Sequence, residues 1–163
     1  SPMIVPLIIT AAGMFFFYSK IGLTHTYLGL ILAHTALGTP FVVITVTATL
    51  TGFDTNLIRA SQSLGADTMR TFFKVIMPLI LPGVISGGLF AFITSFDEVV
   101  IVMFVGSVEQ ITIPKQMWAG LRQETSPVIL CMATCLVALS IALLTTVEML
   151  RRRSERLRGI KQR

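Results

Sequence analysis

The stretch that organises this chain is R-A-S-Q-S-L-G-A-D-T-M-R-T-F-F-K-V-I-M-P-L-I-L-P, residues Arg59–Pro82. It holds a short polar segment, a glycine, a basic amphipathic segment and two prolines, between strongly apolar flanks. Helix start and stop signals together with an apolar stripe predict short helices within this stretch. A connection between apolar segments that folds in its own right is typical of a loop that docks on another molecule.

Charged residues are sparse and unevenly distributed. They make up 13% of the 163 residues, while 53% are hydrophobic and mean hydropathy is +0.81. Soluble domains carry about 25% charged residues. Four stretches contain no Asp, Glu, Lys or Arg: Ser1–Ser19, Ile21–Phe53, Val75–Phe96 and Thr125–Val147. Because a helix crosses a bilayer with about 20 apolar residues, we predict an all-α, polytopic membrane helix bundle with spans near 3–18, 28–50, 80–103 and 127–149.

The basic residues predict the orientation of these spans. Ten of the 13 Lys and Arg residues lie in the 51–79 loop and the tail 151–163. Since cytoplasmic loops carry the basic excess, we expect this loop and the C-terminus in the cytoplasm, with the chain in the cell inner membrane. We therefore predict a transmembrane domain over 1–150 and a basic cytoplasmic tail over 151–163. Anionic lipid explains the basic tail without nucleic acid.

Other signals are weak or missing. Ser1 is not Met, and the chain opens almost directly on apolar sequence without a signal-peptide pattern, which is expected of a partial chain. Cys131 and Cys135 lie four apart in the last apolar stretch, which favours packing on one helix face over a disulfide or a metal site. The sequence lacks nucleotide-binding, nucleophile and His–Cys ligand motifs. We therefore expect no catalytic residues, metal or cofactor on this chain.

Within the 51–79 loop, a first short helix is predicted to begin at Asp54, a residue type that favours helix N-caps. Gly65 is expected to end this helix in a left-handed or tight conformation. Between them, small or apolar residues recur at three- and four-residue spacing and form one face: Leu57, Ala60 or Ser61, and Leu64.

A second helix is predicted to begin at Asp67 and to run toward the membrane as far as Pro78 and Pro82. Its paired aromatic and basic residues, Phe72 and Phe73 beside Arg70 and Lys74, also suit an interfacial helix that lies on lipid.

The loop resembles a motif of the membrane permeases of ABC importers, which work with a substrate-binding protein. The resemblance covers essentially the whole chain, and its matching positions are Arg59-Ala60-Ser61, Leu64-Gly65-Ala66, Arg70, Phe72, Lys74, Val75, Pro78 and Pro82. The family usually has Glu where Arg59 stands and Ala where Ser61 stands. These departures leave open the polar contact normally made at Arg59.

The resemblance implies a type I importer permease fold and a coupling helix that sits in a groove of an ATPase subunit. We assign ATPase coupling to Asp54, Leu57, Arg59, Ala60, Ser61, Leu64, Gly65 and Ala66. The implied partners are an ABC ATPase subunit that holds ATP and Mg²⁺, a second permease subunit, a periplasmic or extracellular substrate-binding protein, and the lipid bilayer.

The third apolar stretch and its continuation, F-A-F-I-T-S-F-D-E-V-V-I-V-M-F-V-G-S-V-E-Q-I-T-I-P-K-Q-M-W, residues Phe90–Trp118, resemble the polyamine branch of these permeases. Acids inside an apolar span usually face a cavity or pathway. The predicted substrate pathway is Asp97, Glu98, Ser95 and His34. Alternatively, an acid pairs with Lys115, Arg122 or a partner subunit, or lies at the headgroup boundary, and His34 is a packed, hydrogen-bonded residue.

The expected function is thus the permease subunit of an ATP-driven importer that translocates polyamines such as spermidine and putrescine. Within the same class, an oxyanion, a ferric complex or thiamine is an alternative substrate. Two other classes stay open: a secondary transporter that uses Asp97 or Glu98 for protons, and a structural membrane subunit.

Overall fold

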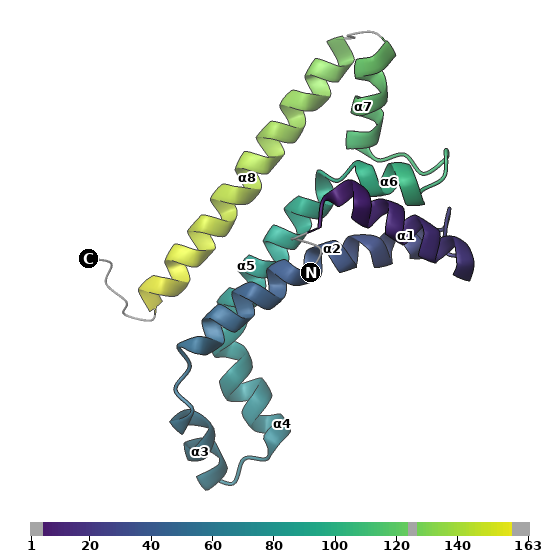
Figure 1. Cartoon of the computed structure of the whole chain (residues 1–163). Helices are drawn as coiled ribbons and strands as arrows, with labels where there is room; N and C mark the ends of the chain where they lie inside the picture. The colour runs from purple at the N-terminus through teal and green to yellow at the C-terminus, as the bar shows by residue number, and fades with distance from the viewer. Residues whose placement is uncertain (1–4, 124–126, 158–163) are drawn as a thin grey trace.

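In the computed structural model of this protein, residues 5–123 and 127–157 are described (Figure 1). Every regular element in these ranges is a helix, which confirms the predicted all-α class. The elements are α1 (Leu7–Ile21), α2 (Tyr27–Thr51), α3 (Asn56–Ser63), α4 (Thr68–Thr71), the π-helix η1 (Phe72–Ile76), α5 (Met77–Phe96), α6 (Val100–Val105), α7 (Ile113–Gln123) and α8 (Pro127–Leu157).

The centre of the molecule is the α2–α5 pair, which makes the most extensive contact between two helices in the described chain. Glycines on both helices allow the two backbones to approach closely. A Cβ atom at Gly38 would lie 2.9 Å from Cβ of Ala91, and one at Gly87 would lie 2.7 Å from Cα of Val42. Small residues at a helix crossing permit such packing between membrane helices.

A compact apolar core lies at the end of this pair remote from α3. It joins α1, the first half of α2, and α6 (Figure 1). Its buried residues are Ala11, Tyr18, Leu30, Ala33, Leu37, Ile101, Val102 and Val105. The short α6 is therefore an internal element, buried between α1 and α2.

Three helices are long and apolar enough to cross a membrane: Tyr27–Thr51, Thr68–Phe96 and Pro127–Thr146. The apolar α1 is shorter, at 15 residues. The predicted span at 80–103 has different helical boundaries, because the helix begins at Thr68 and ends at Phe96.

The expected stop at the two prolines is wrong, since Pro78 and Pro82 both lie inside α5. The π-helix η1 precedes them, and the N–H of Met77 donates to the carbonyl of Phe72, five residues back. A proline lacks the N–H that an α-helix needs and crowds the preceding turn. The wider turn of η1 lets the helix continue into Pro78.

A break at Asp97–Val99 separates α5 from α6, so the two acids lie between helices rather than within a span. The carboxylate of Glu98 accepts a hydrogen bond of 2.9 Å from the N–H of Ile101 in the first turn of α6. An acidic side chain that bonds a nearby backbone N–H competes with helix continuation. This cap accounts for the start of a new helix.

The last helix, α8, packs against α5 and α7 and runs from α7 in the direction of the α3 end (Figure 1). Because α8 extends to Leu157, the predicted division at residue 150 falls inside one continuous helix. Residues 158–163, the end of the predicted tail, lie outside the described residues. Cys131 and Cys135 are both exposed on α8.

Candidate functional site

Two parts of the molecule hold the predicted site residues, and they lie at opposite ends of the α2–α5 pair (Figure 1). The first is the docking loop, residues 54–67. Asp54 marks its start, because its carboxylate accepts a 2.9 Å hydrogen bond from the N–H of Asn56. The backbone carbonyl of Asp54 also accepts from the N–H of Leu57 at 3.1 Å. The helix itself begins at Asn56 with Thr55 as N-cap, one residue later than predicted.

Gly65 ends α3 in the left-handed conformation, with φ of 81°, which confirms the conformation predicted for it. The N–H of Gly65 donates to the carbonyl of Gln62, and the N–H of Ala66 donates to the carbonyl of Ser61. These two bonds form a Schellman motif, which pairs the last carbonyls of a helix. The side chain of Asp67 then caps α4 by accepting from the N–H of Arg70 at 2.6 Å, also as predicted. The turn between α3 and α4 is thus fixed on both sides.

The outer face of α3 carries most of the predicted coupling residues. Leu64 is 88% exposed and Leu57 is 41% exposed, and Arg59 and Ala60 are also exposed. An apolar ridge without cover in this chain is the geometry expected of a docking surface.

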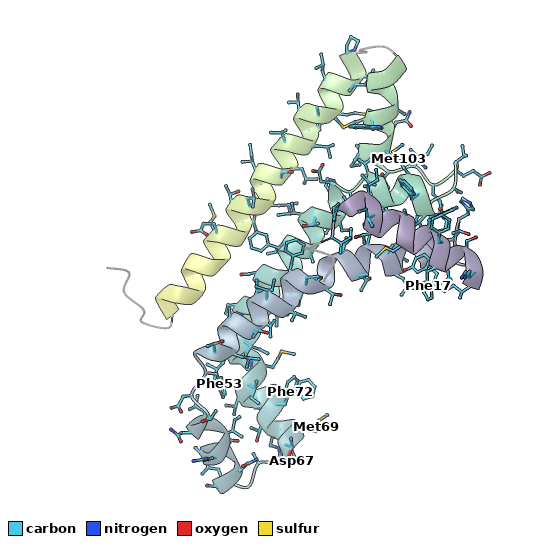
Figure 2. The ribbon with its side chains drawn as sticks, in the orientation of Figure 1. Phe17, Phe53, Asp67, Met69, Phe72 and Met103 are labelled. Carbon is cyan, nitrogen blue, oxygen red and sulfur yellow. The ribbon has the colours of Figure 1, made fainter. Side chains whose placement is uncertain are left out.

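Ser61 lies on the inner face of α3 instead. Its hydroxyl is 2.8 Å from the hydroxyl of Thr71, a residue that is only 2% exposed. This hydrogen bond joins α3 to α4. Figure 2 shows Asp67, Met69 and Phe72 along the neighbouring α4–η1 segment. Sequence analysis missed Thr71, although its hydroxyl lies four residues past the Asp67 cap.

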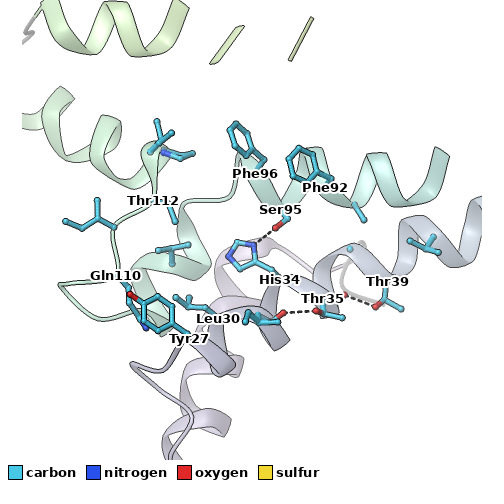
Figure 3. Close-up of a pocket in the computed structure, with 18 of the residues that line it drawn as sticks. Tyr27, Leu30, His34, Thr35, Thr39, Phe92, Ser95, Phe96, Gln110 and Thr112 are labelled. Carbon is cyan, nitrogen blue, oxygen red and sulfur yellow. Dashed lines mark hydrogen bonds between the residues drawn. The ribbon is translucent and has the colours of Figure 1, made fainter. Parts of the chain in front are cut away.

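The second part is a cavity of about 900 Å³ at the far end of the α2–α5 pair, between α2, α5 and the 109–114 segment (Figure 3). His34 and Ser95 from the predicted pathway both line it. Nδ1 of His34 and Oγ of Ser95 are 2.8 Å apart, in a hydrogen bond whose donor depends on the histidine tautomer. Both readings of His34 therefore hold, since it is hydrogen-bonded and also lines a cavity.

Several polar and aromatic residues of the cavity were missed in the sequence. They include Tyr27, Thr35, Thr39, Phe92, Phe96 and Glu109. Those on α2 recur at helical spacing around His34, which was the signal available for finding them. Their partners on α5 follow only from the crossing of the two helices, which single-helix periodicity does not reveal.

Asp97 and Glu98 do not line this cavity. They lie at a smaller one of about 450 Å³, beside Leu7, Ile93, Thr94, Val99 and Val100. Their side chains diverge, as the predicted 100° step implied: Asp97 is exposed, and Glu98 is 6% exposed.

The alternative pairing of an acid with Lys115 is not what this residue does. The ammonium of Lys115 donates to the carbonyls of Ser107 and Gln110, at 2.8 and 3.0 Å. The side chain of Arg122 lies outside the described residues.

Comparison with known proteins matches residues 2–156 to the family of binding-protein-dependent transport system inner membrane components. One relative is the spermidine/putrescine transport system permease protein PotC of Haemophilus influenzae, 31% identical over 93% of this chain and 59% of that protein. PotC of Escherichia coli K12 is 29% identical over 92% of this chain and 57% of its own length. The putrescine transport system permease protein PotI of Escherichia coli K12 is 29% identical, over 84% of this chain and 51% of that protein.

The chain thus spans between 51% and 59% of the length of these three relatives. The predicted resemblance to polyamine permeases is confirmed by their names. The long apolar helices fit a multi-pass protein of the inner membrane, as the family description states. Because the family matches almost the whole sequence, this chain belongs to the binding-protein-dependent transport system inner membrane components.

Proposed function

We propose that this chain is a membrane-spanning permease subunit of an ATP-driven ABC importer, and that the importer carries polyamines across the inner membrane. The observation that carries the proposal is the similarity to permeases named for spermidine and putrescine transport, which extends over 93% of the chain in one case. The family description supports a substrate-binding protein as a partner.

In this proposal α3 is the coupling helix. Its exposed Leu57 and Leu64 dock in a groove of a separate ATPase subunit, which binds ATP and Mg²⁺. The Schellman turn at Gly65 and the Asp67 cap support the role, because they hold α3 at a fixed angle to the long helix 68–96. Closure of the ATPase pair would then move α3 and the 68–96 helix together, as a largely rigid body.

The proposed orientation puts α3 and the C-terminus in the cytoplasm and the 900 Å³ cavity toward the outer face. The basic excess of the 51–79 loop and the tail supports this arrangement. A cavity at the outer end of the spans is placed to take substrate from a binding protein. Since one chain leaves this cavity open to one side, a second permease subunit completes the pathway.

His34 and Ser95 are the proposed pathway residues in this cavity. Asp97 is proposed to attract the cationic substrate through its exposed carboxylate. Glu98 serves the pathway indirectly, because its carboxylate holds the first turn of α6.

The test is expression of the full-length protein with a candidate ATPase, partner permease and binding protein. We expect the subunits to copurify and the assembled complex to take up labelled spermidine or putrescine only with ATP. Uptake driven by a proton gradient without the ATPase would instead indicate a secondary transporter. ATP-driven uptake of an oxyanion, a ferric complex or thiamine, with no polyamine uptake, would refute the polyamine substrate and leave the importer class standing.

A further inference from the structure

The wall that α2 contributes to the 900 Å³ cavity carries two hydroxyl groups whose hydrogens are already used. Oγ1 of Thr35 donates to the carbonyl of Ile31, and Oγ1 of Thr39 donates to the carbonyl of Thr35, both at 2.7 Å. A hydroxyl has one hydrogen to donate and two lone pairs. Both side chains are exposed and line the cavity (Figure 3). They therefore present hydrogen-bond acceptors to a ligand.

The facing wall, from α5, is aromatic. The rings of Phe92 and Phe96 are stacked, with centroids 5.6 Å apart and an interplanar angle of 25°. Figure 3 shows them on the other side of the His34–Ser95 contact from Thr35 and Thr39. Aromatic faces attract cations through the ring quadrupole and also pack against methylene groups.

The charge at the cavity has one sign. Among its described lining residues, Glu109 carries the carboxylate and none is Lys or Arg. The nearby ammonium of Lys115 is directed to the carbonyls of Ser107 and Gln110. An anionic ligand would meet lone pairs and a carboxylate, whereas a cationic donor would meet partners on both walls.

We propose that this cavity is a binding site for the primary ammonium groups of a linear polycation. Thr35 and Thr39 accept hydrogen bonds from an ammonium group, Phe92 and Phe96 cover the methylene chain, and Glu109 holds a second ammonium at the mouth. The inference rests on the proposed function and deepens it, because it assigns cation selectivity to the α2–α5 cavity rather than to the two acids at the break.

The test is the full-length complex with Thr35→Val and Thr39→Val combined, which keeps the shape and removes both acceptors. We expect the KM for putrescine uptake to rise by about tenfold, since a hydrogen bond to a charged group is lost. The combined Thr35→Ser and Thr39→Ser variant keeps both hydroxyls and should retain a KM near that of the wild type. Glu109→Gln should raise KM at low ionic strength and less at high salt, because salt screens an exposed charge.

Thr134→Val is the matched control. Thr134 is exposed on α8 and donates to the carbonyl of Leu130 at 2.8 Å, in the same way as the two cavity threonines, but it does not line the cavity. We expect it to leave KM unchanged. A wild-type KM in both the valine pair and Glu109→Gln, in a complex that takes up putrescine, overturns the site and leaves the proposed function intact. Should the wild-type complex take up no polyamine at all, the proposed function itself fails. If the valine pair does not reach the membrane, the serine pair and Glu109→Gln decide the question.

Discussion

At the scale of single residues, local sequence signals were sufficient where one backbone conformation demands one residue type. Gly65 and Asp67 were both predicted correctly, because a left-handed helix end and a helix N-cap are chemical problems that few residues solve. Glu98 was misjudged, since its carboxylate has a structural partner that lies in the next helix rather than in the pathway.

Gly65→Val tests the left-handed turn. A residue with a Cβ is less stable by about 1–2 kcal/mol in this conformation, and a β-branched one is disfavoured further. We expect the variant to reach the membrane and to hydrolyse ATP in its complex, while uptake per ATP falls severalfold. Gly65→Asn is the control, because Asn tolerates the left-handed region, and it should couple nearly normally. Normal uptake in Gly65→Val, with the ATPase subunit bound, would contradict a coupling role for this turn.

The two acids at the break are expected to respond differently. Asp97→Asn should leave the membrane level of the protein unchanged and lower polyamine uptake about tenfold, because a charge-assisted contact contributes about 1.5–3 kcal/mol. Glu98→Gln keeps an acceptor for the N–H of Ile101 and should lose little, whereas Glu98→Leu removes the cap and should lower thermal stability. Uptake assays and melting curves separate these outcomes. Loss of uptake in Glu98→Gln alone would reverse the assignment.

At the scale of elements, the helices were predictable and their ends were less so. Runs without charge located α1, α2, the 68–96 helix and α8 to within several residues. The stop at Pro78 was wrong because η1, a π-helical turn, absorbs the missing N–H, and residue patterns do not reveal such a turn. The break at 97–99 was missed because apolar sequence continues on both sides of it.

Ser61→Ala tests the link between α3 and the 68–96 helix. The change removes the hydroxyl partner of buried Thr71 and should loosen α3, since such a bond contributes about 1 kcal/mol. We expect uptake per ATP to fall, with unchanged membrane level, and Ser61→Thr to restore it. Ser63→Ala is the control on the same helix, because Ser63 is exposed and bonds only the carbonyl of Arg59. Equal coupling in Ser61→Ala and Ser63→Ala would show that the hydroxyl pair has no part in transmission.

Gly87→Ala tests the crossing of α2 and α5. The added Cβ would lie 2.7 Å from backbone Cα of Val42, which has little room to move. Overpacking of this kind costs about 1–3 kcal/mol, so the melting temperature of the purified complex should fall by several degrees. Gly88→Ala, one residue on, has nothing within 4 Å of the added Cβ and should be neutral or slightly stabilising. Equal melting temperatures for the two variants would rule out the close approach at Gly87.

At the scale of the whole molecule, the sequence separated the docking loop from the pathway but did not locate the cavity. The loop is encoded within 14 residues, 54–67, so its turns and caps are visible locally. The cavity is formed by residues such as His34 and Ser95, which are 61 positions apart and meet only because α2 crosses α5. The polar lining of α2 looked like ordinary threonines in an apolar helix until α5 was placed against it.

The orientation of the molecule is the remaining prediction, and two exposed positions at opposite ends make it testable. Val108 is 90% exposed in the segment after α6, and Leu64 is 88% exposed at the end of α3. We replace each with Cys in a background where Cys131 and Cys135 are Ser. In intact cells, a membrane-impermeant thiol reagent should label Val108→Cys and not Leu64→Cys, and a reporter active only in the cytoplasm should be active after Arg163.

After permeabilisation, Leu64→Cys should become labelled when the ATPase subunit is absent and be protected when it is bound. Protection follows from the exposed ridge of α3, because a docked partner covers Leu64 and leaves Val108, at the other end of the α2–α5 pair, accessible. Labelling of both cysteines from the outside of intact cells would place α3 and the 900 Å³ cavity on the same side of the membrane. That result would break both the predicted orientation and the coupling role that depends on it.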